Sequence, residues 1–321
     1  MSTLVQQPAA PSGATPQPPR RQGVAPVRLV RAELLKIWTT NSWWIFAICA
    51  FVTTALAMLI NIVQAHIEMD QAQNPPDFGE VPPGEEGGPP PIDEDFQFNL
   101  ARVILRNTAN VYTSGQFFGL LFVMILGTLI VTNEFYHQTA TATFLTTPKR
   151  TSVIFAKLGA AVGLAGFFWL VTTIIDIGVG TLFLLDAGYP MSLDEWPVIR
   201  AILFNLPAYA IWAVLGVGLG VLIRSQLGAT LTGAGLYLIA GQIAQVAFFI
   251  IYQFWIKEDW VIKAMVALPS VASQIMISAD RVPLGPGVLG PPWWVGALVL
   301  IGYGLVAGTI GTLITRKRDI S

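Results

Sequence analysis

The chain contains six apolar stretches, and each is long enough to cross the hydrocarbon core of a bilayer. A helix needs about 20 mainly apolar residues to span roughly 30 Å of hydrocarbon, and helices buried in soluble proteins rarely contain such runs. Only 12% of the 321 residues are charged, against about 25% in ordinary soluble domains. The sequence therefore predicts an all-α integral membrane protein with six transmembrane helices. The predicted spans are Trp43–Val63, Ser114–Val131, Phe155–Leu185, Ala201–Ile223, Leu227–Phe254 and Trp293–Ile314.

The charges between these spans predict how the chain is threaded. Short loops rich in Lys and Arg stay in the cytoplasm. Basic residues precede the first span, occupy the second and fourth loops and follow the last span, whereas acidic residues gather in the first and third loops. All basic segments fall on one side when six spans are threaded, so we expect a multi-pass plasma-membrane protein with both termini in the cytoplasm. The basic residues are Arg20, Arg21, Arg28, Arg31, Lys36, Lys149, Arg150, Lys157, Arg224, Arg316, Lys317 and Arg318.

Two segments precede the first span. Residues 1–26 are rich in Pro, Gln and Ala, which predicts a disordered cytoplasmic tail before a transmembrane domain at 27–321. Apolar residues from Val27 to Thr39 recur at helical spacing, which predicts an amphipathic helix lying in the cytoplasmic interface. The charged residues on or beside its polar face are Arg28, Arg31, Glu33 and Lys36.

Two further segments are expected on the outer side. Residues 65–113 read as an acidic, Pro-rich loop, whose last part, from Asp95, is compatible with a helix. Residues 255–292 are too polar to span twice and too apolar for a plain loop. They predict two short, re-entrant-like helices separated at Pro269, whose broken backbone is shielded by protein.

The segment NEFYHQTATATFLTTPKR, between spans two and three, is the most informative for function. Its polar residues cannot lie in lipid without a large desolvation cost. Phe135, Ala142 and Leu145 recur at roughly helical spacing, and Pro148 ends the run. The pattern predicts a short cytoplasmic helix tied to both spans, which a soluble partner could grip.

Several kinds of chemistry have no signature in the sequence. There is no G-x-x-x-x-G-K-[ST] loop for ATP phosphates, no zinc-ligand spacing and no paired catalytic carboxylates at membrane depth. We therefore expect neither enzymatic activity nor a cofactor or metal on this chain. Asp176 is the one acid well inside an apolar run, and it is explained equally by a structural hydrogen bond or by an ion relay. Glycine pairs such as Gly216/Gly220 indicate close helix packing.

The order of these elements, with a short local motif, resembles the permease subunit of ABC-2-type (type V) ABC exporters. The family motif has a Glu after the second span, a Gly-Thr, a pair such as Leu-Leu, and a Pro followed by basic residues. Here the matches are Glu134, Thr139, Phe144-Leu145 and Pro148-Lys149-Arg150, with Lys157 following. Gln138 stands where the family has Gly. The stretch RAELLKIWTT is also similar to the first helix of that family.

The resemblance implies a permease that pairs with a second, identical or related chain and depends on separate ATP-binding subunits. Those partners would bind ATP and Mg, and no nucleic-acid partner is expected. The helix around Glu134–Thr147 would be the coupling helix, with partner-binding residues Glu134, Phe135, Tyr136, Thr139, Phe144, Leu145, Pro148, Lys149 and Arg150. Substrate would pass between spans two and five, beside Phe117, Phe118, Leu121, Phe122, Tyr237, Gln242, Gln245 and Phe248. Export is implied by the resemblance alone, and the cargo is left open.

The alternative is an ion-coupled secondary transporter or channel that works without an ATPase. It would use Asp176 or the polar groups of span five, but the two inverted repeats common in that class are not visible. An intramembrane enzyme ranks last, because no nucleophile with a base and no metal cluster occurs at membrane depth.

Overall fold

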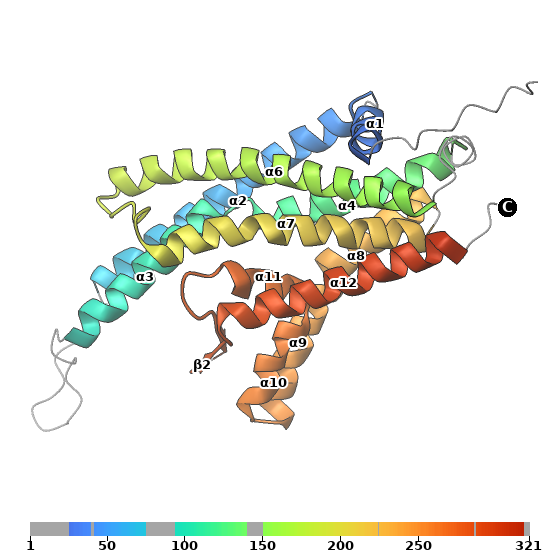
Figure 1. Cartoon of the computed structure of the whole chain (residues 1–321). Helices are drawn as coiled ribbons and strands as arrows, with labels where there is room; N and C mark the ends of the chain where they lie inside the picture. The colour runs from blue at the N-terminus through green and yellow to red at the C-terminus, as the bar shows by residue number, and fades with distance from the viewer. Residues whose placement is uncertain are drawn as a thin grey trace, which may run out of the picture.

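The computed structural model describes residues 26–39, 42–74, 94–139, 150–223, 225–285 and 287–317. Within these ranges the chain is an elongated helical bundle with one small β-hairpin (Figure 1). The α-helices are α1 (Pro26–Trp38), α2 (Ser42–Gln73), α3 (Glu94–Tyr112), α4 (Gln116–Tyr136), α6 (Arg150–Asp186), α7 (Trp196–Leu222), α8 (Gln226–Gly235), α9 (Gly241–Ile250), α10 (Asp259–Lys263), α11 (Pro269–Ile277) and α12 (Trp293–Lys317). Two π-helical turns, η1 (Leu236–Ala240) and η2 (Ile251–Trp255), continue α8 and α9, and the 3₁₀ turn η3 (Ala264–Ala267) follows α10.

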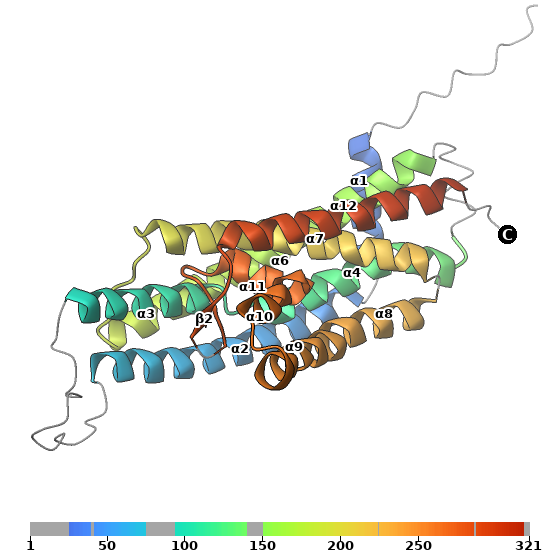
Figure 2. The same cartoon turned by 90° about the horizontal axis from the view of Figure 1, so that it is seen from below.

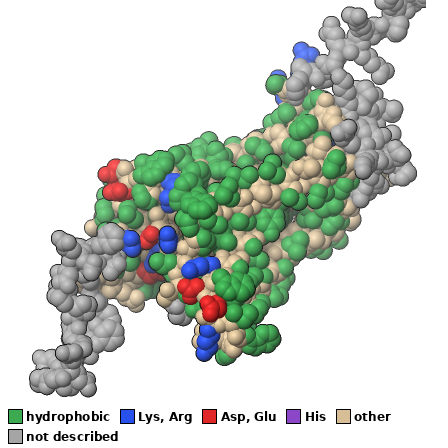
Figure 3. Space-filling model, turned by 60° about the horizontal axis from the view of Figure 1, so that its bottom comes forward, with side chains coloured by type: hydrophobic (Ala, Val, Ile, Leu, Met, Phe, Trp, Pro, Cys, Tyr) green, Lys and Arg blue, Asp and Glu red, His purple; other side chains and the backbone are tan. Residues whose placement is uncertain are grey.

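Six helical segments of the described chain are long and apolar enough to cross a membrane, as the sequence predicted. Large apolar side chains cover much of their outer surface, for example Phe51 and Leu59 of α2, which are more than half exposed. Figure 3 shows one such side, where hydrophobic side chains dominate and charged groups gather toward one end. The fold is therefore compatible with a multi-pass membrane protein. The six segments are Trp44–Gln73, Leu100–Tyr136, Thr151–Asp186, Trp196–Leu222, Gln226–Trp255 and Trp293–Ile314.

The core of the bundle is built around α4. This helix runs between α2, α6, α7 and α8 (Figures 1 and 2), and most of its side chains are buried. Its backbone approaches that of α7 closely at Gly127 and Gly216, where an added methyl group would overlap a carbonyl oxygen of the facing helix. The Thr128 hydroxyl also donates to the Gly216 carbonyl at 3.1 Å. Glycine therefore allows these two apolar helices to pack backbone to backbone.

The predicted loop at residues 65–113 is helical at both of its ends. Helix α2 continues to Gln73, ten residues beyond the predicted span end at Val63, and α3 begins at Glu94. The extension is stable because it packs on α3: Glu68 accepts hydrogen bonds from Arg106 at 2.7 Å and Asn107 at 3.0 Å. The Pro-rich residues 75–93 lie outside the described ranges.

The segment 255–292 contains two short helices, as predicted, and a hairpin that was not. The α10–η3 helix and α11 meet at 95°, and α11 begins at Pro269. The short antiparallel pair β1 (Pro283–Gly285) and β2 (Val288–Leu289) follows. A small buried hydrophobic cluster, which includes Ile262, Val271 and Ile275, lies between the two short helices and the hairpin. The depth of this unit in a membrane stays a prediction.

The two ends of the bundle carry different elements. Helix α1, the end of α4 and the end of α12 lie at one end, and α3 lies at the other (Figure 1). An even number of crossings brings the first and last helices to the same side, so this arrangement agrees with six spans. Which side faces the cytoplasm follows from the charge pattern alone.

Candidate functional site

Helix α1 packs across the neighbouring ends of α4 and α6. Val30 contacts the backbone of α6 at Gly159, and Leu34 and Ile37 pack on the main core. The residues Val27 and Leu35 are exposed. A helix thus exists at Pro26–Trp38, where an interfacial helix was predicted, and its apolar stripe is divided between the bundle and the outside.

Four charged side chains meet where these three helices converge, and we call them the quartet: Glu33, Lys36, Glu134 and Lys157. Glu33 binds Lys36 at 2.8 Å and Lys157 at 3.0 Å. Glu134 binds Lys36 at 2.7 Å and Lys157 at 3.1 Å. Each carboxylate therefore joins both ammonium groups, and the four ion pairs form a closed ring. The Lys157 ammonium also donates to the Ile130 carbonyl at 3.0 Å.

Three of the four side chains of the quartet are buried, and its two negative and two positive charges balance. The side chains of Glu33, Glu134 and Lys157 are only 8%, 7% and 5% exposed, whereas that of Lys36 is 46% exposed. Burial alone would lower the pKa of Lys36, but its hydrogen bonds to Glu134 and Glu33 and their negative charges outweigh this and raise it. Removing one member would leave an uncompensated buried charge, which costs about 3–5 kcal/mol.

Helix α4 ends immediately after the quartet in a backbone turn. The Thr139 amide donates to the Glu134 carbonyl at 2.9 Å, and the Gln138 amide donates to the Phe135 carbonyl at 3.3 Å. Gln138 has φ = 55°. These are the bonds and the left-handed residue of a Schellman motif, a position that usually carries glycine. Glutamine thus occupies a helix-terminating position that glycine usually fills.

This turn corrects the predicted coupling helix. Residues Glu134, Phe135 and Tyr136 form the last turn of α4, and Gln138 is left-handed, so α4 does not continue as one helix from Glu134 to Thr147. The left-handed conformation at Gln138 is the reason, because a right-handed helix cannot pass through it. Residues 140–149 lie outside the described ranges, and with them Phe144, Leu145, Pro148 and Lys149. Arg150 is the first residue of α6, and its side chain is also outside the description.

The surface beside the quartet carries aromatic and basic groups. Tyr136 is 69% exposed and packs edge-on against His137, with ring centroids 5.0 Å apart. Phe135 is 38% exposed, and Arg28 and Arg31 of α1 are exposed. Such a surface offers a protein partner both apolar area and charged rim contacts.

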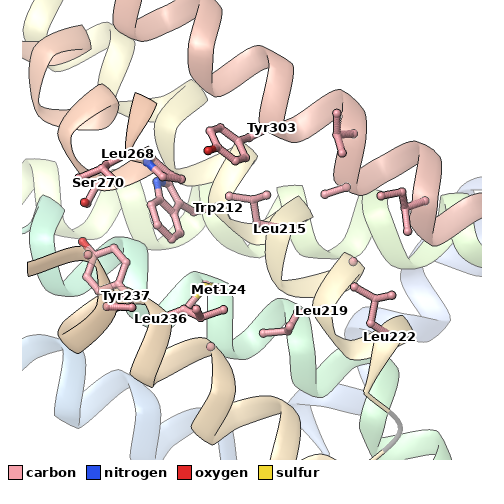
Figure 4. A pocket seen from close by; sticks show the side chains of 18 of the residues that line it. Met124, Trp212, Leu215, Leu219, Leu222, Leu236, Tyr237, Leu268, Ser270 and Tyr303 are labelled. Atoms are coloured by element: carbon pink, nitrogen blue, oxygen red, sulfur yellow. The ribbon is translucent and has the colours of Figure 1, made fainter. Parts of the chain in front are cut away.

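The predicted path residues lie in different surroundings within the described chain, where Tyr237 lines one cavity (Figure 4) and Phe117 another. Phe117 and Tyr237 do meet, because the Tyr237 hydroxyl donates to the Phe117 carbonyl at 2.6 Å, and Phe117 also packs on Phe118. Leu121 is buried in the main core, and Phe122 packs against Phe46 of α2. On α9, Gln242 is exposed and Gln245 partly buried, and Phe248 packs in the cluster of α10 and α11.

A second buried polar site lies where α3 gives way to α4. The chain turns at Thr113–Gly115, and the Asp176 carboxylate accepts from the Gly115 amide at 2.9 Å. The Tyr209 hydroxyl donates to the Gly115 carbonyl at 3.1 Å. Asp176 is 1% exposed, and its Oδ1 atom has no partner among the described residues. The Asp176 carboxylate of α6 therefore accepts a hydrogen bond from a backbone amide at the break between α3 and α4. Such contacts from a neighbouring helix stabilise broken helices that are buried in protein.

The quartet and this break mark the two limits of an apolar layer. Glu134 of α4 follows Gly115, the residue just before that helix, by 19 residues, and Asp176 follows Lys157 by 19 residues within α6. At 1.5 Å per residue this separation is about 28 Å, close to the roughly 30 Å of a bilayer core. Beyond the break lies a polar hollow of about 470 Å³, lined by side chains that include Glu68, Arg106 and Gln274. The two polar sites are therefore separated by about the thickness of a bilayer core.

The pairing within the quartet was not predicted from the sequence. Lys157 was counted with the basic residues near the second loop, and Glu33 was given no partner. One signal was present: Lys157 lies among apolar residues in VIFAKLGAA, and a lysine so placed needs a carboxylate. Glu33 and Glu134 are acids expected on the same side of the membrane.

The sequence of this chain matches no protein-family model and no curated protein.

Proposed function

We propose that this chain is the membrane-spanning permease subunit of an ATP-driven exporter of the ABC-2 type. It works as a pair of such chains and is moved by separate ATP-binding subunits. The observation that carries the proposal is the buried quartet, which ties α1 to the end of α4 and the start of α6 on either side of residues 140–149.

The connections of this region suit the transmission of force. Residues 140–149 leave α4 through the turn at Gln138 and enter α6 at Arg150. A push on this segment acts on both helices, and the quartet resists their separation because opening it would expose or strand buried charges. Helix α4 packs along α7 through Gly127 and Gly216, so a displacement of α4 moves the bundle core. Packed helices that shift as rigid bodies are a common form of such switching.

The energy source would have to come from a partner. The full sequence contains no phosphate-binding loop, so ATP and Mg would be bound by the ATP-binding subunit. Tyr136, Phe135 and the arginines of α1 supply a surface on which such a subunit could dock. The direction of transport follows from the resemblance to exporters.

Site-specific crosslinking tests this docking surface. A photoreactive benzoylphenylalanine replaces Tyr136 in the full chain, expressed in its native host, and adducts are identified by mass spectrometry. We expect an adduct with an ATP-binding subunit. The matched control places the same group at Trp196, which is 61% exposed at the start of α7. Crosslinking of that subunit from the control position, or only of lipid from Tyr136, would contradict the proposal.

Asp176 favours a second candidate, ion-coupled transport without an ATPase. A carboxyl group 1% exposed, with one oxygen unpartnered among the described residues, is typical of an ion relay as well as of a structural bond. Uptake by liposomes containing the chain alone, driven by an ion gradient and abolished by Asp176→Asn, would establish this candidate in place of the first.

A further inference from the structure

The polar hollow beyond the break at Gly115 has two unlike walls, and the proposed coupling assigns it no role. Its volume of about 470 Å³ lies within the range of roughly 300–1,000 Å³ that is usual for small-molecule sites. Helices α2 and α3 supply only polar side chains to it. Its apolar side chains all come from α4, α11 and the segment at β1, and they are Phe117, Ile277, Val282 and Pro283.

Carboxamide groups dominate the polar lining, and several of them are not used by the protein. The side chains of Asn110 and Gln274 form no hydrogen bond with any described residue. Gln116 is only 6% exposed. Its amide donates to the Ser273 carbonyl at 3.4 Å, but its carbonyl oxygen has no donor among the described residues. The five carboxamides of the hollow are Asn61, Gln64, Asn110, Gln116 and Gln274.

The free oxygen of Gln116 points to a ligand. A polar group that is buried this far is normally hydrogen-bonded, so we expect a molecule in the hollow to supply the donor. The free groups of Asn110 and Gln274 add further donors and acceptors in the same hollow.

The two charged side chains of the hollow neutralise each other. Glu68 and Arg106 pair at 2.7 Å, and their side chains are 30% and 27% exposed. Glu68 also accepts hydrogen bonds from Gln64 at 2.9 Å and Asn107 at 3.0 Å, so both of its oxygens are occupied. A cation would have to displace these donors, and an anion would have to compete with Glu68 for Arg106. The lining therefore favours a ligand without net charge.

The two walls together match a sugar ring. A carboxamide presents a donor and an acceptor side by side, and a hydroxyl group both donates and accepts. Several carboxamides around one hollow therefore suit a ligand with several hydroxyls. A pyranose ring carries its hydroxyls on its edge and C–H groups on its faces. Its edge can bind the carboxamides while one face lies on the apolar wall.

We propose that the hollow binds a neutral sugar ring, which is hydrogen-bonded by Asn110, Gln116 and Gln274 and lies against Phe117. The ring belongs to a free sugar or to the head group of a glycolipid. The inference concerns binding alone and does not rest on an ATPase partner.

Saturation-transfer NMR on the full chain in phosphatidylcholine nanodiscs tests this site. The probe is methyl β-D-glucoside, a single neutral ring. We expect a saturable signal and an affinity about ten-fold or more higher than for D-glucuronate or D-glucosamine, because each of these brings an unpaired charge to the hollow. No saturable signal, or equal affinity for all three, would overturn the proposal. Binding of N-acetylglycine amide in place of the glucoside would also overturn it.

A second arm separates the two sources of the ring. The glucoside signal is measured again in nanodiscs that contain a glucosyl diacylglycerol. Loss of the signal supports the proposal with a glycolipid head group as the source, and an unchanged signal supports it with a free sugar.

Matched carboxamide variants locate the binding. Asn110→Ala and Gln274→Ala each remove an exposed side chain with no other partner among the described residues. Each should weaken glucoside binding roughly three- to ten-fold, the effect of one lost hydrogen bond. Gln242→Ala is the control, because Gln242 is an exposed carboxamide of α9 that does not line the hollow, and it should leave binding unchanged.

The variants stay informative even if one of them does not fold. Should Asn110→Ala fail to fold, Gln274→Ala and Gln242→Ala still form a matched pair. Equal glucoside affinity of these two variants would overturn the proposal.

Discussion

Replacing Lys157 with methionine should destabilise this protein more than any exposed lysine replacement. The variant keeps the length and apolar stem of the side chain and removes one positive charge from the quartet. Glu33 and Glu134 each lose a partner at about 3 Å, and the Ile130 carbonyl loses its donor. The quartet then carries a net charge of −1, and both of its carboxylates are buried.

The expected loss is about 3–5 kcal/mol of unfolding free energy, the cost of stranding one partner of a buried ion pair. Glu33→Gln in the Lys157→Met background removes the excess charge and keeps the pair of Lys36 and Glu134. The double variant should therefore recover about 1–3 kcal/mol relative to Lys157→Met, as residues in contact couple by this amount.

Denaturant unfolding in lipid–detergent micelles, followed by tryptophan fluorescence, measures these differences. Lys263→Met is the matched control, because Lys263 pairs with Asp259 four residues away and both side chains are about half exposed. Such pairs contribute about 0–1 kcal/mol. A loss for Lys157→Met no larger than for the control, or a double variant less stable than the single one, would refute the argument from the quartet.

Three further outcomes follow from the described geometry. Gln138→Gly should raise the unfolding free energy by about 0.5–1 kcal/mol, because the φ of 55° at Gln138 is favourable for glycine and strained for glutamine. Gln138→Ala should give no gain in the same unfolding assay. Gly216→Ala should lower the unfolding free energy by about 1–3 kcal/mol, because the added methyl group overpacks against α4. Gly178 has open space around it, so Gly178→Ala should raise the unfolding free energy by about 0.5–1 kcal/mol. Equal effects of the two variants would contradict the close packing of α4 and α7. Asp176→Leu should lower the unfolding free energy by about 1–3 kcal/mol, because the Gly115 amide loses its acceptor. Asp176→Asn keeps an oxygen at this position and should lower it less. The reverse order would show that the bond to Gly115 does not stabilise the break.

The apolar helices could be predicted from the sequence because a bilayer restricts both the length and the polarity of a helix that crosses it. A helix must be long and apolar to cross a hydrocarbon core, so the six apolar runs mark the six helical segments that are long and apolar enough to do so. Pro269 likewise marks a helix start, since proline lacks the amide that a helix interior requires. The end of α2 was missed because its last turns are polar. Their helical state depends on Glu68 meeting Arg106 from another helix, and hydropathy contains no term for that contact.

The candidate site was predicted only in its parts. Glu134 and Lys157 were both noted as single positions of a motif. Their pairing depends on α1 crossing two helix ends, which is a tertiary fact. The end of α4 was missed for a local reason: Gln138 adopts a conformation that glycine would have signalled and glutamine does not. Helical spacing of Phe135 and Leu145 therefore suggested one helix where the chain turns.

ATP hydrolysis by the complex purified from the native host through a tag on this chain tests the central claim most directly. The account predicts vanadate-sensitive hydrolysis with the wild-type chain. Replacing residues 140–149 with a Gly-Ser linker of equal length should abolish that activity. The same replacement of residues 76–85 should leave the activity unchanged. Absence of hydrolysis from the wild-type complex, or equal hydrolysis after both replacements, would contradict it.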